Sequence, residues 1–131
     1  MAANAAKILV VDDDPIVRCS LERVLTTVGH EVEAVGSGVD AVRALAARAF
    51  ELVILDLRMP RLGGLTVLQH VQRNHSDVPV VVMTGFPSIE NATECIQMGA
   101  FDFLLKPLDP DRVRQVVACA LAGRPWCLQR R

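Results

Sequence analysis

The chain lacks a strong excess of charge of either sign. Its 131 residues include 14 Lys and Arg against 15 Asp and Glu, which gives a formal net charge of −1 at pH 7. A global basic field, the kind that holds nucleic acid or an anionic membrane surface, is therefore missing. We expect this domain to bind neither nucleic acid nor a membrane.

Long apolar runs and export signals are missing as well. No apolar stretch approaches the roughly 20 residues that a transmembrane helix needs. The N-terminal MAANAAK has neither the charged nor the apolar region of a signal peptide. The sequence therefore predicts a cytoplasmic location.

Metal-binding patterns of cysteine and histidine are the third absence. The four cysteines form no C-x-x-C pair and show no zinc-like spacing with the three histidines. These cysteines are Cys19, Cys95, Cys119 and Cys127. We expect them to be ordinary reduced thiols.

Short apolar runs are what the sequence does contain. With 51% hydrophobic and 22% charged residues, the chain fits one globular domain with a single sizeable core. Four runs rich in Val, Ile and Leu lie at 7–13, 52–56, 80–84 and 101–106. Runs without polar alternation are typical of parallel strands that are buried on both faces. Residues 31–35, EVEAV, alternate as an edge strand does.

Helical patterns separate these strands. Apolar stripes predict helices over about 17–28, 42–49, 65–71, 88–98 and 109–121. The second stripe consists of Val42, Leu45, Ala46 and Ala49. Because parallel strands need crossover connections, alternating strands and helices predict an α/β domain with a five-stranded parallel sheet. We assign 1–6 to an N-terminal tail, 7–122 to the domain, and 123–131 to a C-terminal tail or the start of a linker.

Each of the four apolar runs stops at a polar residue. The first ends at Asp12 and Asp13, and the others end at Asp56, Thr84 and Lys106. In open parallel sheets, ligands bind in the crevice outside the carboxyl ends of the strands. We therefore expect these five side chains to converge at one edge of the sheet.

Such a set of side chains suits phosphoryl transfer. Three converging carboxylates repel one another and raise at least one pKa unless a cation intervenes, and Mg²⁺ is the hard cation that fits. Lys106 is a point charge for a phosphoryl oxygen, and the Thr84 hydroxyl can donate a hydrogen bond. Aspartate can itself be the nucleophile, and positioning with charge neutralisation supplies most of the catalysis.

Four stretches resemble the receiver domain of two-component response regulators. They are VVDDD, LVILDLRMP followed by Gly63-Gly64, VVVMTG and GAFDFLLKP, and the resemblance runs from Lys7 to about Ala122. It implies a flavodoxin-like fold with strand order 2-1-3-4-5 and helices on both faces of the sheet. It also implies a phosphorylatable signalling switch.

The resemblance assigns roles at the acidic strand ends. Asp56 would accept the phosphoryl group from a histidine of a sensor kinase or of a phosphotransfer protein. Asp12, Asp13, Asp56 and the backbone carbonyl of Arg58 would hold Mg²⁺. The Arg58 side chain could hover over the site or face solvent, and the sequence favours neither.

Further roles follow on the last two strands. Thr84 and Lys106 would grip the phosphoryl oxygens, and the bond from Lys106 to Pro107 matches the cis peptide of the family. Phe103, three residues before Lys106, would turn inward behind Thr84 as the switch. It stands where many relatives carry Tyr, so a switch that relies on a phenolic hydroxyl is not expected.

The fourth predicted helix is the expected moving part. Only Ile89, Ala92, Ile96 and Cys95 are available for its apolar face. Because little apolar burial means low local stability, we expect this helix to shift on phosphorylation. The resemblance also implies a possible homodimer through helix 4, strand 5 and helix 5.

Three readings of function differ in class. The first is the switch, which catalyses only its own phosphorylation and dephosphorylation and acts as a stand-alone regulator or as a fragment of a transcriptional regulator. The second is a pseudo-receiver, an interaction module without phosphorylation. The third is a phosphatase with an aspartate nucleophile after the first strand, which would leave Asp56 without a role.

Overall fold

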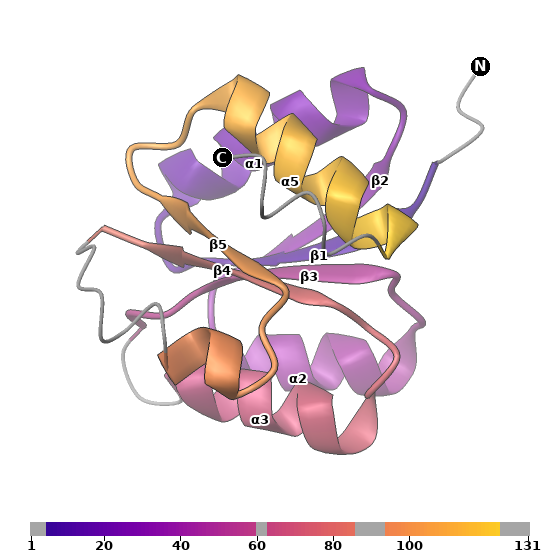
Figure 1. Cartoon of the computed structure of the whole chain (residues 1–131), viewed down its shortest axis with the longest axis vertical. Helices are drawn as coiled ribbons and strands as arrows, with labels where there is room; N and C mark the ends of the chain where they lie inside the picture. The colour runs from indigo at the N-terminus through magenta and orange to yellow at the C-terminus, as the bar shows by residue number, and fades with distance from the viewer. Residues whose placement is uncertain (1–4, 60–62, 86–93, 124–131) are drawn as a thin grey trace.

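The computed structural model describes residues 5–59, 63–85 and 94–123. Strands and helices alternate along the chain (Figure 1). The elements are β1 (Lys7–Val11), α1 (Pro15–Thr27), β2 (Glu31–Val35), α2 (Gly38–Ala47), β3 (Leu52–Asp56), α3 (Gly64–Asn74), β4 (Val80–Thr84), β5 (Asp102–Leu105) and α5 (Pro110–Ala122). Residues 94–97 form a further helical turn before β5.

All five strands form one parallel sheet in the order β2-β1-β3-β4-β5. The predicted fold is confirmed. Helices α1 and α5 cover one face of the sheet, and α2 and α3 cover the other (Figure 1). The central strands β3 and β4 are buried at every position, because both of their faces are covered.

Alternate residues of each strand enter two separate cores. In β1, Ile8 and Val10 join the core under α1 and α5, whereas Leu9 and Val11 join the core against α2 and α3. All four side chains are fully buried. This alternation is the two-residue period of a strand, and it explains why a run of consecutive apolar residues was required.

Two helices begin at an aspartate cap. The Asp14 carboxylate accepts a hydrogen bond of 2.9 Å from the Ile16 N–H at the start of α1. The Asp109 carboxylate accepts one of 3.0 Å from the Asp111 N–H at the start of α5. Each cap satisfies one of the free N–H groups of a first helical turn. For α1, the cap starts the helix directly after the acidic end of β1.

The predicted face of α2 was partly wrong. Leu45 is buried as expected, but Ala46 and Ala49 are exposed, and Ala41 and Ala44 are buried instead. The helix ends at Ala47, so the predicted stripe was displaced along the chain and around the helix. Small residues gave too weak an apolar signal to fix the face.

The fourth predicted helix is described only at its C-terminal end. Residues 94–97 are helical, while the positions from Ser88 to residue 93 lie outside the described residues. Cys95 is buried in the core against α2 and α3, and Ile96 is 41% exposed. Ile96 was therefore wrongly assigned to the apolar face, because the adjacent Cys95 occupies the inward position.

The cysteines do not all behave as predicted. Cys19 and Cys95 are free thiols, but Cys119 is disulfide-bonded, so the expectation of reduced thiols was wrong for Cys119. Spacing rules test for metal sites and say little about which thiols meet in space.

Within the described ranges, no helix has the length and apolarity needed to cross a membrane.

Candidate functional site

The polar strand ends meet at one edge of the sheet. Asp12 follows β1, Asp56 and Thr84 are the last residues of β3 and β4, and Lys106 follows β5. These strands are parallel neighbours, so their carboxyl ends lie together. One carboxylate oxygen from each of Asp12, Asp13 and Asp56 lies within 4.8 Å of the other two. The predicted convergence is thus present for the three carboxylates.

The members of this acidic cluster (Asp12, Asp13 and Asp56) differ in their access to solvent. Asp12 is fully buried, and Asp56 is only 4% exposed, as is the neighbouring Thr84. Asp13, in contrast, is exposed. The cluster therefore has a closed inner side and an open outer side from which a small ligand can enter.

Lys106 is shared between two of the carboxylates. Its Nζ lies 2.8 Å from Asp12 Oδ2 and 3.4 Å from Asp56 Oδ2. Although burial acts in the opposite direction, the hydrogen bond with Asp12 and the charges of Asp56 and Asp12 raise the pKa of Lys106. The ammonium group therefore stays charged at neutral pH.

Asp56 is the member of the cluster whose ionised form is disfavoured by its surroundings. Burial is the main reason that its pKa is raised, and the nearby Asp12 charge adds to the rise. The Arg58 N–H and the charge of Lys106 oppose this effect. Three carboxylates around one ammonium group leave an excess of negative charge, so a second cation would relieve the repulsion.

Backbone N–H groups orient both buried carboxylates in the same way. Asp12 Oδ1 accepts a hydrogen bond of 2.9 Å from the Asp14 N–H. Asp56 Oδ1 accepts one of 3.1 Å from the Arg58 N–H. In each carboxylate the other oxygen, Oδ2, faces Lys106. Each carboxylate is thus held by the backbone N–H of the residue two positions later in the chain.

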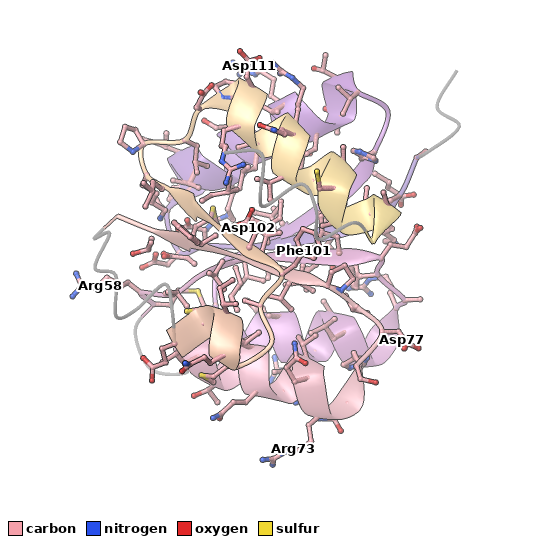
Figure 2. The ribbon with its side chains drawn as sticks, in the orientation of Figure 1. Arg58, Arg73, Asp77, Phe101, Asp102 and Asp111 are labelled. Atoms are coloured by element: carbon pink, nitrogen blue, oxygen red, sulfur yellow. The ribbon has the colours of Figure 1, made fainter. Side chains whose placement is uncertain are left out.

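The Arg58 side chain takes the solvent-facing alternative. It is exposed, and Figure 2 shows it pointing outward from the molecule at the edge where β4 ends. Its backbone is held toward the cluster by the bond from its N–H to Asp56. The carbonyl of Arg58 as a metal ligand stays a prediction.

The paired strands β4 and β5 both end beside the acidic cluster. The Lys106 N–H donates a hydrogen bond of 2.9 Å to the Thr84 carbonyl, which ties the two strand ends together. The peptide bond from Lys106 to Pro107 is cis, as predicted. Phe103 is half-buried and packs against the core under α2 and α3. Its part in switching stays a prediction.

Helix α3 begins in direct contact with the main chain of the site. A Cβ atom at Gly64 would lie 2.4 Å from the Asp56 carbonyl oxygen and 2.6 Å from Leu57 Cα. Both neighbours are backbone, so a side chain at this position would displace either α3 or the end of β3. The pair Gly63-Gly64 at the start of this helix therefore contains one position where only glycine fits.

Arg18 is a contributor that the sequence reading missed. Its Nη1 donates a hydrogen bond of 2.7 Å to the carbonyl of Asp12. A Cβ at Gly36 would lie 3.0 Å from the same nitrogen, so the chain after β2 leaves little room for this guanidinium. The available signal was spacing, because Arg18 lies one helical turn after the Asp14 cap.

The arrangement has a definite chemical capacity. A cluster of carboxylate oxygens is the ligand type that hard divalent cations prefer. The ammonium group of Lys106 and the carboxylate of Asp56 are adjacent, so a charge that develops on a group bound to Asp56 would be neutralised. Both features suit a covalent reaction with a phosphoryl group better than the binding of an apolar ligand.

Comparison with known proteins agrees with this chemistry. The model of the response regulator receiver domain family matches residues 8–118. The chain is 40% identical over 111 residues to the luminescence regulatory protein LuxO of Vibrio campbellii, covering 85% of this chain and 24% of that protein. It is 39% identical over 123 residues to the transcriptional regulatory protein ZraR of Salmonella typhimurium, covering 93% of this chain and 28% of that protein.

A solved structure gives the same result at the level of coordinates. The crystal structure of the receiver domain of NtrX from Brucella abortus superposes with a TM-score of 0.84 at 38% identity, covering 88% of this chain and 98% of that one. The chain spans about a quarter of the length of the curated relatives that it matches, 24% of LuxO and 28% of ZraR. By its sequence, its strand order and its superposition, the chain belongs to the receiver domains of two-component response regulators.

Proposed function

We propose that this receiver domain takes a phosphoryl group onto Asp56 from a phosphohistidine of a sensor kinase or of a phosphotransfer protein. The observation that carries the proposal is the position of Asp56, a buried carboxylate inside an acidic cluster with Lys106 at 3.4 Å. In the reaction, an Asp56 oxygen forms a bond to phosphorus while the bond from phosphorus to the donor nitrogen breaks. The leaving imidazole keeps that electron pair.

Mg²⁺ is the proposed cofactor. Asp12, Asp13 and Asp56, with the backbone carbonyl of Arg58, would hold the ion, and the closeness of the three carboxylates supports this. When bound, the ion neutralises charge on the cluster and on the phosphoryl oxygens. Asp13 is exposed, so it can admit the ion from solvent.

Lys106 and Thr84 are the proposed contacts of the phosphoryl oxygens. Lys106 already reaches the Asp56 carboxylate, and Thr84 is held beside it by the bond from the Lys106 N–H to the Thr84 carbonyl. A phosphoryl group on Asp56 would draw Lys106 from Asp12 toward its own oxygens. With Phe103 behind Thr84, this pair is the proposed start of the conformational signal.

The output of the switch is proposed from its relatives. LuxO and ZraR are regulatory proteins of which this chain matches only the receiver part, so an output region elsewhere or a separate target is expected. A homodimer through helix 4, β5 and α5 is supported by Ile96 and Leu105, which are 41% and 45% exposed. A cytoplasmic location stays a prediction.

The decisive experiment is intact-mass spectrometry after incubation with acetyl phosphate and Mg²⁺. We expect the wild type to gain one phosphoryl group and Asp56→Asn to gain none. Asp102→Asn is the matched control, since it also neutralises a buried aspartate but lies outside the cluster. A wild type that stays unlabelled would favour the pseudo-receiver, and steady turnover of a small phosphomonoester would favour the phosphatase.

A further inference from the structure

A hollow of about 770 Å³ lies at the edge of the sheet opposite the acidic cluster. It is bounded by the turn between α3 and β4, the approach to β5 and the end of α5. In Figure 2, Asp77 marks this edge, whereas Arg58 marks the edge of the cluster. The hollow has no part in the chemistry described above.

The lining of the hollow is mixed, with an apolar part and an acidic part. Phe50, Phe101 and Leu121 line it, and the last two are only half-buried in the described structure. Glu51 and Asp77 also line it, and both are exposed. A cavity of this size and lining suits a large ring that carries or adjoins positive charge.

The segment that follows α5 in the same chain contains such a ring and such positive charges. Gly123 lines the hollow, and the residues that follow it, 124–131, read RPWCLQRR. Trp126 is the only tryptophan in the chain and lies three residues beyond Gly123, a reach of roughly 10 Å. The segment also carries three arginines, at positions 124, 130 and 131, which complement the acidic part of the lining.

We propose that this hollow is the docking site of residues 124–131 of the same chain, with Trp126 entering between Phe101 and Leu121. The indole would remove apolar surface from water on both partners. The arginines would lie near Glu51 and Asp77. The proposal does not depend on phosphorylation.

Docking would connect two ends of the molecule that the sheet leaves apart. Phe101 lies one residue before β5, and Lys106 lies one residue after it. The segment after α5 would thus rest on the start of the strand whose other end carries the lysine of the acidic cluster. Whatever follows position 131 in a longer chain would leave from this edge.

The test uses the intrinsic fluorescence of the full 131-residue chain. With one tryptophan and no tyrosine, emission reports on Trp126 alone. The buffer contains a thiol reductant, so that the emission does not depend on the disulfide at Cys119. We expect emission at shorter wavelength than in the urea-unfolded chain, and weaker quenching by acrylamide.

Two variants change the hollow from different sides. Asp77→Arg reverses a charge in the acidic part of the lining at an exposed position, and Leu121→Gln makes the apolar part more polar. Both are expected to shift the emission to longer wavelength and to increase quenching. Glu22→Arg, at an exposed position of α1 outside the lining, is the control that should change neither. Far-UV circular dichroism verifies that each variant is folded.

Three results would overturn the proposal. The first is wild-type emission and quenching equal to those of the unfolded chain. The second is a shielded Trp126 that responds to neither Asp77→Arg nor Leu121→Gln, which would place it against another surface. The third is shielding that disappears on dilution, which would make a second copy of the chain the occupant.

Discussion

Asp102 and Asp12 are both buried carboxylates, but the molecule balances their charges in different ways. Asp102, at the start of β5, faces Arg112 of α5 at 3.4 Å and accepts a hydrogen bond of 2.7 Å from the Phe103 N–H. Asp12 shares Lys106 with Asp56, and Asp13 adds a third carboxylate nearby. One region has an arginine for its acid, and the other has more acids than cations.

The difference separates a structural ion pair from a site prepared for a ligand. A buried carboxylate with its own cation and a backbone donor needs nothing further. A cluster with excess negative charge retains affinity for a second cation. The same residue type is therefore structural at β5 and available for chemistry at β1 and β3.

The largest effect should come from removing the cation on each side of this comparison. Lys106→Met should slow labelling by acetyl phosphate about 100-fold, the usual effect of losing one charge-stabilising donor. Arg112→Met should label at the wild-type rate. Time-resolved intact-mass spectrometry at fixed Mg²⁺ measures both rates. Equal slowing in the two variants would remove the distinction between the regions.

Mg²⁺ should act on one region only. At a concentration 100 times its dissociation constant, the ion should stabilise the wild type by about 2.7 kcal/mol. Asp13→Asn, a change at an exposed position of the cluster, should lose most of this gain, and Asp102→Asn should keep it. Urea unfolding with Mg²⁺ and with EDTA gives the difference. Stabilisation that persists in Asp13→Asn would argue against the proposed ligand set.

Neutralising one acid in each region should change stability in opposite directions. Burial raises the pKa of Asp56, so its ionised form costs stability once the pH is above that raised value. Without Mg²⁺, Asp56→Asn should therefore be more stable than the wild type at neutral pH. The gain should vanish as the pH falls to the ordinary aspartate value of 3.8 and below.

Asp102→Asn should instead lose about 1–2 kcal/mol at neutral pH, because it removes a charged acceptor facing Arg112. Urea unfolding of both variants at pH 7.5 and in acid, followed by circular dichroism, is the measurement. The same sign for the two changes at neutral pH would contradict the electrostatic contrast.

The smallest expected effect concerns Arg18, which supports Asp12 through its backbone carbonyl. Arg18→Gln should weaken Mg²⁺ binding by about 0.5–1.5 kcal/mol, the net value of one hydrogen bond. Arg23→Gln, an exposed position on the same helix, is the control. Calorimetric titration with Mg²⁺ compares the two. Equal affinities would make Arg18 a packing residue only.

The acidic edge of the sheet could be predicted from the sequence because it follows from the parallel direction of the strands. Once strands are parallel, residues at their carboxyl ends must converge, so Asp12, Asp56, Thr84 and Lys106 were found without side-chain detail. The pairing of Asp102 with Arg112 was not found, because it depends on how α5 sits on β5. No one-dimensional period encodes that placement.

Helix faces were predictable only where large residues marked them. In α1, Leu21 and Leu25 lie within the predicted stripe and are buried, but Val28, at the end of that stripe, lies beyond the end of the helix and is 45% exposed. In α2, two of the four buried residues are alanines, whose small side chains mark the buried face of a helix only weakly. Large apolar side chains thus identify the buried face of a helix, whereas small ones leave its position undetermined by about one residue.

The absent side chain at Gly64 has a consequence for engineering. Main chain packed on main chain has no rotamer to change, so the start of α3 and the end of β3 can only move as one piece. A fluorophore attached at the start of α3 would therefore perturb the very strand end that it was meant to observe. A biosensor made from this domain should carry its label near Leu105, whose side chain is 45% exposed.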